Sequence, residues 1–222
     1  GKKDTKVTLG IKRNSSSKPI SFDIIRGEIP VHSVDASYII APTVGYIKVN
    51  KFSKNTFHEF ISSLNNLRND GAKKYIVDLR GNGGGYMESA ILMANEFLPA
   101  GRMIVNTKSR VDSIATLSDG NGSFKEAELV VLIDEFSASA SEIFAGAIQD
   151  HDRGLIVGRR SFGKGLVQQQ LPLVDNSAIR LTVARYYTPS GRCIQKDYKL
   201  GDKNYSQEIY ERFSHGEALN AD

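Results

Sequence analysis

The sequence predicts an α/β fold, in which strands alternate with helices and the helices cover a sheet. The chain has 222 residues, of which 40% are hydrophobic and 24% are charged, so it holds enough apolar material for a sizeable core. Short β-branched runs alternate with segments whose apolar residues recur at helical spacing. Three segments rich in glycine or serine each follow a strand, where an α/β fold connects one element to the next.

The first part of the chain predicts a hairpin, with strands at residues 6–12 and 20–26 and a turn at residues 14–18. A two-stranded hairpin is only marginally stable by itself. We therefore expect these strands to be the end of a domain whose earlier part precedes Gly1.

From Tyr38 onward the pattern becomes that of strands separated by helices. The helix expected at residues 56–68 has one apolar stripe, formed by Phe57, Phe60, Ile61, Leu64 and Leu67. Further helices are expected at residues 87–98 and 139–150, and strands at 44–49, 74–79, 128–133, 155–158, 166–173 and 179–187. Residues 118–124 predict an exposed loop, and residues 205–222 predict no regular element.

Charge and residue usage exclude several classes of function. The 29 basic and 25 acidic residues give a net charge of +4 without any block of like charge, so no nucleic-acid partner is expected. Cys193 is the single cysteine, which excludes an intrachain disulfide and a cysteine-based zinc site. The four histidines do not fall at a metal-ligand spacing. No apolar run approaches the ~20 residues that cross a bilayer. We expect no metal, no cofactor and no membrane span.

The first chemically informative segment is residues 78–85, Asp-Leu-Arg-Gly-Asn-Gly-Gly-Gly. Its glycines leave the backbone free to turn N–H groups toward an anion or a carbonyl oxygen. The order of the glycines is not that of a dinucleotide-binding loop. A tight turn without chemistry is the alternative interpretation.

The second segment is residues 134–142, which contain three small serines before an apolar helical stripe. Ser139 and Glu142 have the spacing of a capping box, so one interpretation is that Ser139 only caps the helix. A serine at the start of a helix also lies beside unpaired N–H groups and the positive end of the helix dipole. That is where an oxyanion would be stabilised.

The third segment, residues 158–165, matches the pattern GxxxxGK of a phosphate loop. Gly165 stands where such a loop needs Ser or Thr, and a strand is expected to follow instead of a helix, so an NTPase is disfavoured. Lys164 lies between two glycines with apolar neighbours, and we expect it to lose its water and act as a general base for Ser139. A Ser-His-Asp triad is disfavoured because His151 lies a whole helix beyond Ser139.

Together, four segments resemble the C-terminal processing peptidases, also called tail-specific proteases. They are residues 78–85, 137–142, 162–165 and 187–192 (Tyr-Thr-Pro-Ser-Gly-Arg). The resemblance implies that Ser139 is the nucleophile and that Lys164, 25 residues later, is the base. It further implies that Gln168, four residues after the lysine, orients it.

The same resemblance implies an oxyanion hole made by the backbone N–H of Ala140 and by that of Gly84 or Gly85. The sequence does not choose between the two glycines. Asp150, eleven residues after the serine, is implied as a supporting residue, and Glu142 of the capping box is a second candidate for support.

At the level of the whole chain, the resemblance implies a ClpP/crotonase-like catalytic core at residues 29–222. Residues 1–28 would be the last strands of a PDZ-like domain whose carboxylate-binding loop precedes Gly1. The implied function is a serine endopeptidase with a Ser-Lys dyad that cleaves near the C-termini of proteins, with exposed C-terminal tails as partners. The implied location is the bacterial cell envelope or periplasm.

Two other classes of function remain open. One is a non-catalytic binding module for hydrophobic ligands or peptides on the same fold. The other is a crotonase-like acyl-CoA enzyme that uses the glycine loop. Neither calls for a lysine paired with Ser139, so both are disfavoured.

Overall fold

The computed structural model describes residues 1–28, 31–197 and 201–217, which fall into two compact units, Gly1–His32 and Ser33–Asp222. The boundary predicted from the sequence lies after residue 28. In the first unit, β1 (Lys6–Ile11) and β2 (Ile20–Ile25) pair antiparallel, so the expected hairpin is confirmed. Its membership of a PDZ-like domain stays a prediction.

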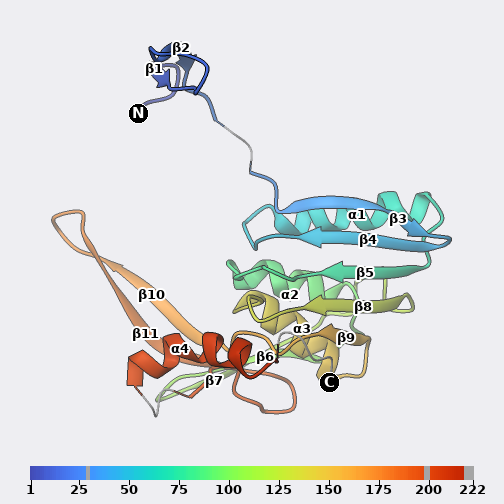
Figure 1. Cartoon of the computed structure of the whole chain (residues 1–222). Coiled ribbons are helices and arrows are strands. Elements are labelled where there is room, and N and C mark those ends of the chain that lie inside the picture. Colours follow the sequence, from blue (N-terminus) through green and yellow to red (C-terminus); the bar gives the residue numbers. More distant parts are fainter. Residues whose placement is uncertain (29–30, 198–200, 218–222) are drawn as a thin grey trace. The chain divides into compact units, whose positions relative to one another are not determined.

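The second unit is built on a five-stranded sheet, whose strands lie one beside the next in Figure 1. The strand order is β3-β4-β5-β8-β9, with β3 antiparallel to β4 and the other pairs parallel. Its strands are β3 (Val34–Ala41), β4 (Val44–Val49), β5 (Lys74–Asp78), β8 (Glu128–Ile133) and β9 (Leu155–Gly158). The predicted α/β class is confirmed.

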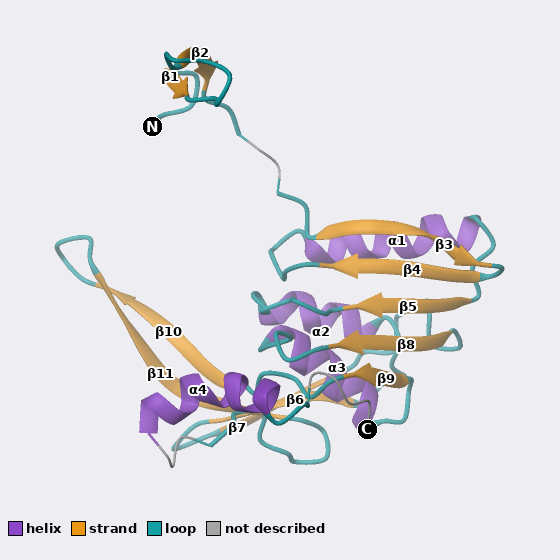
Figure 2. Ribbon diagram, in the orientation of Figure 1, coloured by secondary structure: helices purple, strands orange, loops and turns teal. Residues whose placement is uncertain are grey.

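Three helices lie on one face of this sheet, as Figure 2 shows. They are α1 (Thr56–Asn69), α2 (Met87–Asn95) and α3 (Ala140–Asp150). Alternate residues of the sheet point toward these helices. Ile47, Val77 and Val131, which are paired neighbours on adjacent strands, are all fully buried. From α1 the side chains of Phe60 and Leu64 complete this core, while two other members of the predicted stripe pack at its margin.

A second sheet of four antiparallel strands follows the order β10-β11-β6-β7. Its strands are β6 (Met103–Lys108), β7 (Ser113–Leu117), β10 (Leu166–Pro172) and β11 (Ala178–Tyr187). In Figure 1, β10 and β11 run out from the rest of the unit as a long hairpin. The strands β3, β6 and β7 were not predicted, because their apolar and polar residues do not alternate cleanly and cross-strand pairing decides their conformation.

Two expectations about irregular segments are wrong. Residues 118–124 are not a wholly exposed loop, since Ser118, Gly122 and Phe124 are buried against the core. The polar C-terminal segment does form an element, α4 (Gly201–Ser214), in which Arg212 is buried and bonds to the main chain of Arg160. None of the helices in the described ranges has the length and apolar character needed to cross a membrane.

Candidate active site

The parallel strands β4, β5, β8 and β9 end at the same edge of the sheet, so the segments that follow them meet there. Among these are the glycine segment after β5, the serine segment after β8 and the lysine segment after β9. The three segments that the sequence singled out are therefore neighbours in space.

Ser139 occupies a strained turn between β8 and α3. Its backbone angles are φ 56° and ψ −111°, outside the regions that residues with a side chain normally occupy. Strain of this kind costs about 1–3 kcal/mol and is found mainly at functional sites. Ser139 caps α3 and forms the predicted capping box with Glu142. The turn presents the half-buried Ser139 at the positive end of α3.

The other two serines of the run have structural roles. Ser137 Oγ donates to Leu79 O at 2.8 Å, and Ser141 Oγ donates to Asn82 O at 2.9 Å. Both serines are fully buried. Ser139 Oγ donates to no acceptor in the part of the chain that the structure describes. Of the three hydroxyls, that of Ser139 is the one left able to give its proton to another group.

The glycine segment packs directly against this serine. A Cβ added to Gly84 would lie 2.5 Å from Ala138 O and 2.8 Å from Ser139 Cβ, and one on Gly85 would lie 1.9 Å from Phe52 O. Both glycines have positive φ, 91° and 142°. Only glycine combines this conformation with so close an approach.

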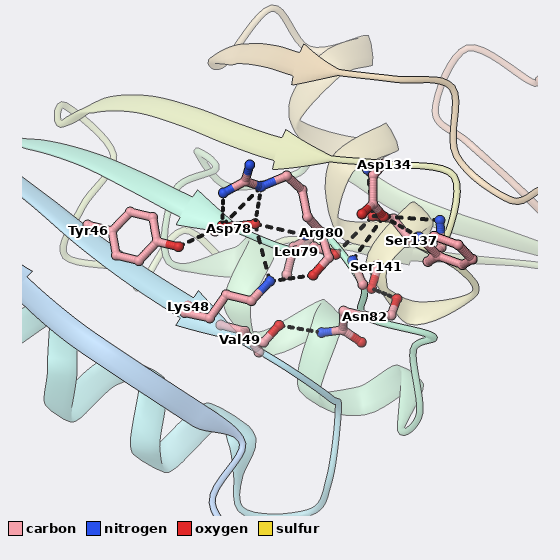
Figure 3. Close-up of polar contacts among 12 residues, drawn as sticks. Tyr46, Lys48, Val49, Asp78, Leu79, Arg80, Asn82, Asp134, Ser137 and Ser141 are labelled. Carbon is pink, nitrogen blue, oxygen red and sulfur yellow. Dashed lines mark hydrogen bonds and ion pairs between the residues drawn. The ribbon is translucent and has the colours of Figure 1, made fainter. Parts of the chain in front are cut away.

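Asn82 ties the glycine and serine segments together, as Figure 3 shows. Its Nδ2 donates to Val49 O at 2.8 Å, and its main-chain oxygen accepts Ala138 N–H at 3.0 Å in addition to the Ser141 hydroxyl. Asp134 Oδ1 accepts Gly81 N–H at 2.9 Å. No role for Asn82 or Asp134 was predicted from the sequence, although the position of Asp134 directly after a buried strand was an available signal.

An ionic cluster around the buried Asp78 anchors the glycine segment to the end of β5, as Figure 3 also shows. Asp78 accepts hydrogen bonds from Tyr46 Oη at 2.6 Å, from Lys48 Nζ at 3.3 Å and from Arg80 Nη2 at 2.6 Å. Burial opposes ionisation of Asp78, but the bonds from Arg80 and Tyr46 and the charge of Lys48 outweigh it and lower its pKa to about 2. Burial and the Asp78 carboxylate raise the pKa of Tyr46 to about 12.

The two oxyanion candidates of the glycine segment differ in their hydrogen bonds. Gly84 N–H donates to Asn82 Oδ1 at 2.9 Å and is therefore occupied. Within the described residues, the N–H groups of Gly85 and Ala140 donate to no acceptor. Ala140 is the first residue of α3, where unpaired N–H groups are expected.

Glu142 is the centre of the polar contacts around Ser139. Its Oε2 accepts the N–H of Ser139 at 2.8 Å and that of Lys164 at 2.9 Å. Its Oε1 accepts Ser161 Oγ and Gly163 N–H, both at 2.7 Å. Burial raises the pKa of the Glu142 carboxyl, against these four bonds, which lower it. This side chain thereby joins the serine segment to the lysine segment.

Lys164 is brought to the same edge of the sheet as Ser139 by these bonds to its main chain. Its side chain is exposed, so the expectation that it loses its water in this state is wrong. Lys164 lies just before β10, and no element in the described part of the chain buries its side chain. Gln168 is also exposed, lies on β10 beside a bulge between Val167 and Gln168, and has no hydrogen bond with Lys164 in the described part.

Asp150 lies at the opposite end of α3 from Ser139. Because a helix rises about 1.5 Å per residue, the difference of eleven positions separates the two by roughly 16 Å. Its carboxylate accepts Ser190 N–H at 2.9 Å and pairs with Arg192. His151, the alternative base, is beside it and contacts Met103 O at 2.7 Å. Neither residue is placed at the serine.

No group of three or more potential metal ligands occurs among residues 1–28, 31–197 and 201–217. The polar groups at the site are instead a hydroxyl, an amine, a carboxylate and free main-chain N–H groups. These are the components of covalent acyl transfer by a serine.

Comparison with known proteins identifies the protein family of the chain. The model of Peptidase family S41 matches residues 43–202. Since this is most of the chain, the chain belongs to peptidase family S41. The match contains all three segments that meet at the candidate site.

Two curated relatives share much of the sequence. The "Carboxy-terminal-processing protease" of Bartonella bacilliformis is 41% identical over 201 residues, which are 88% of this chain and 46% of that protein. The "Probable CtpA-like serine protease" of Staphylococcus haemolyticus is 37% identical over 212 residues, which are 92% of this chain and 42% of that protein. The chain thus spans less than half the length of these relatives.

Among solved structures, the photosystem II D1 C-terminal processing protease has a TM-score of 0.67 with 30% identity, over 88% of this chain and 54% of that one. A putative S41 protease of Bacteroides fragilis has a TM-score of 0.63 over 95% of this chain and 65% of that one. Its identity is 15%, so this second likeness is one of fold.

Proposed function

We propose that this chain is the catalytic core of a serine endopeptidase in which Ser139 is the nucleophile and Lys164 is the base. The observation that carries the proposal is that one oxygen of Glu142 accepts the N–H groups of both residues, at 2.8 and 2.9 Å. The main chains of the two residues are therefore held to a common point. The strained turn at Ser139 supports its role as the reactive serine.

In the proposed reaction, Ser139 Oγ attacks the carbonyl carbon of a peptide bond and its proton passes to Lys164 Nζ. The electron pair of the carbonyl moves to its oxygen. When the C–N bond breaks, Lys164 returns the proton to the departing amine, and water then repeats the sequence on the acyl-enzyme. We expect a bound polypeptide to cover the exposed lysine and exclude water from it.

We propose that Gly85 and Ala140 form the oxyanion hole. Their N–H groups have no acceptor among the described residues, whereas that of Gly84 is bonded to Asn82. The donor at Ala140 also lies at the positive end of α3. Gly84 then has a different role, because its missing side chain lets the glycine segment approach Ser139. Gln168 would orient the lysine once β10 is covered by substrate.

We further propose that the enzyme cleaves its substrate proteins near their C-termini. Its support is the names of the relatives, which describe carboxy-terminal processing. The test is mass spectrometry of the products from one unfolded protein, with its C-terminus either free or fused to a folded domain. Cuts confined to the last segment of the free form would support the proposal. Equal internal cleavage of both forms would contradict it.

The catalytic proposal is tested with an unfolded protein substrate and three variants. Ser139→Ala and Lys164→Arg should each lose at least about 10³-fold in rate, the second because a guanidinium keeps its proton. Lys73→Arg is the matched control, since Lys73 is exposed and directly precedes β5, at the opposite end of that strand from the candidate site. Binding of the substrate by all forms without cleavage by any would instead favour the binding-module interpretation.

A further inference from the structure

The helix α4 contacts the segment that leads to Lys164. A shallow pocket is lined jointly by Ile209, Arg212 and Phe213 of α4 and by Glu135 and Arg159. Glu135 belongs to the serine segment, and Arg159 belongs to the lysine segment. They are joined by two hydrogen bonds, of 2.7 and 3.0 Å. The helix thus lies across both segments of the candidate site.

Arg212 is the residue of α4 that reaches the main chain of the lysine segment. Its side chain is 9% exposed. Nη2 donates to Arg160 O at 2.5 Å, and Nη1 makes a longer contact of 3.4 Å with Ser161 O. The planar guanidinium carries several donors in fixed directions, which suits it to holding neighbouring carbonyl groups.

Glu217 holds Arg212 in this position. It accepts Arg212 Nε at 2.9 Å, and its second oxygen accepts Arg160 Nη2 at 3.2 Å. The bonds from Arg212 and Arg160 lower the pKa of Glu217 below its usual value, so this carboxylate stays ionised near neutral pH. Arg160 is therefore held through both its carbonyl oxygen and its side chain.

Glu142 and Arg212 hold opposite kinds of groups on the same short segment. The donors of residues 161–164 point to Glu142, namely Ser161 Oγ, Gly163 N–H and Lys164 N–H. The acceptors just before them, the carbonyls of Arg160 and Ser161, point to Arg212. A segment without regular structure is fixed only if both sets are satisfied.

We infer that Arg212 is a positioning residue for Lys164, acting through the carbonyls of Arg160 and Ser161. The inference rests on the proposed function, because it concerns the base of that reaction. A displacement of about 1 Å at a reacting group can cost 10²-fold in rate, so the loss of this support should lower kcat. The affinity for parts of the substrate that bind away from the base should change much less.

The test compares Arg212→Met and Arg212→Lys with Arg153→Met. Arg153 is the matched control because it also holds main-chain carbonyls, those of Phe97, Phe124 and Ala127, but away from the lysine segment. Arg212→Met should lower kcat about tenfold or more with KM within threefold, and Arg212→Lys should recover part of the loss. Arg153→Met should leave kcat of the folded protein within twofold.

Hydrogen exchange of the amides at residues 161–165 provides a readout that does not need activity. It should rise about tenfold or more in Arg212→Met and stay unchanged in Arg153→Met. Unchanged exchange, or faster exchange with unchanged kcat, would overturn the inference. If the wild-type chain shows no Ser139-dependent proteolysis, the proposed function fails, while exchange still decides whether Arg212 holds the segment. If Arg212→Met does not fold, kcat and hydrogen exchange of Arg212→Lys test the inference instead.

Discussion

Glu142 Oε2 accepts the backbone N–H of Lys164 at 2.9 Å, although the two residues are 22 positions apart. The bond is made by the main chain, so it sets the position of the lysine segment independently of the lysine rotamer. The same oxygen accepts Ser139 N–H. A single buried carboxylate therefore determines where the two segments lie relative to each other.

Replacing Glu142 by Gln should separate these segments. The glutamine NH₂ group would face two of the four donors that the carboxylate now accepts, and each buried donor left unpaired costs about 1–3 kcal/mol. We expect kcat to fall by about 10²-fold, measured on an unfolded protein substrate. Glu88→Gln is the control, since Glu88 also lies in the first turn of a helix but is exposed. Equal activity of both variants would contradict the role of Glu142.

Replacing Gly84 by Ala should impair both stability and catalysis. The added Cβ would lie 2.5 Å from Ala138 O and 2.8 Å from Ser139 Cβ. Gly81→Ala is the matched control, because Gly81 also has positive φ, 72°, but nothing lies within 4 Å of its Cβ. The control should lose only the roughly 1–2 kcal/mol of left-handed backbone strain. Thermal unfolding and kcat of the two variants would be compared, and a similar loss in both would count against close packing at Ser139.

Asp78 should make the stability of the chain depend on acid pH. The pKa of Asp78 in the folded state, about 2, lies below its ordinary value of 3.8, so its contribution to stability is fully present above pH 3.8 and is lost as the pH falls through 2. The difference corresponds to about 2 kcal/mol. Denaturant unfolding between pH 5 and pH 2 should show this loss in the wild type and lack that component in Asp78→Asn. Parallel pH profiles for the two proteins would show that the cluster does not stabilise the ionised carboxylate.

Asp150→Asn should affect stability more than catalysis. The carboxylate bonds to Ser190 and Arg192 at the end of α3 that is remote from Ser139, so the substitution removes the negative partner of Arg192. We expect a lower unfolding temperature but a kcat within about threefold of the wild type, because no reacting group moves. A loss of kcat approaching that of Lys164→Arg, with the fold intact, would instead place Asp150 in the catalytic machinery.

The sequence by itself determined the α/β class, most of the long elements and the three segments that carry the chemistry. These are local properties. Residue spacing along one strand or helix decides which face is apolar, as in α1, where Phe60 and Leu64 are buried. Glycine and serine after a strand likewise indicate a turn at the end of the sheet. The capping box of Ser139 and Glu142 was also readable, because its two members are three residues apart.

The tertiary structure alone decided which groups of these segments meet. The link from Glu142 to Lys164, the bond that occupies Gly84 N–H and the contact of Arg212 with the lysine segment each depend on chain geometry or on packing between distant elements. The exposure of Lys164 is of the same kind, since its neighbours in sequence are apolar but no described element covers it. A pattern along the chain reports burial within one element, whereas the environment of a loop is set by elements many residues away.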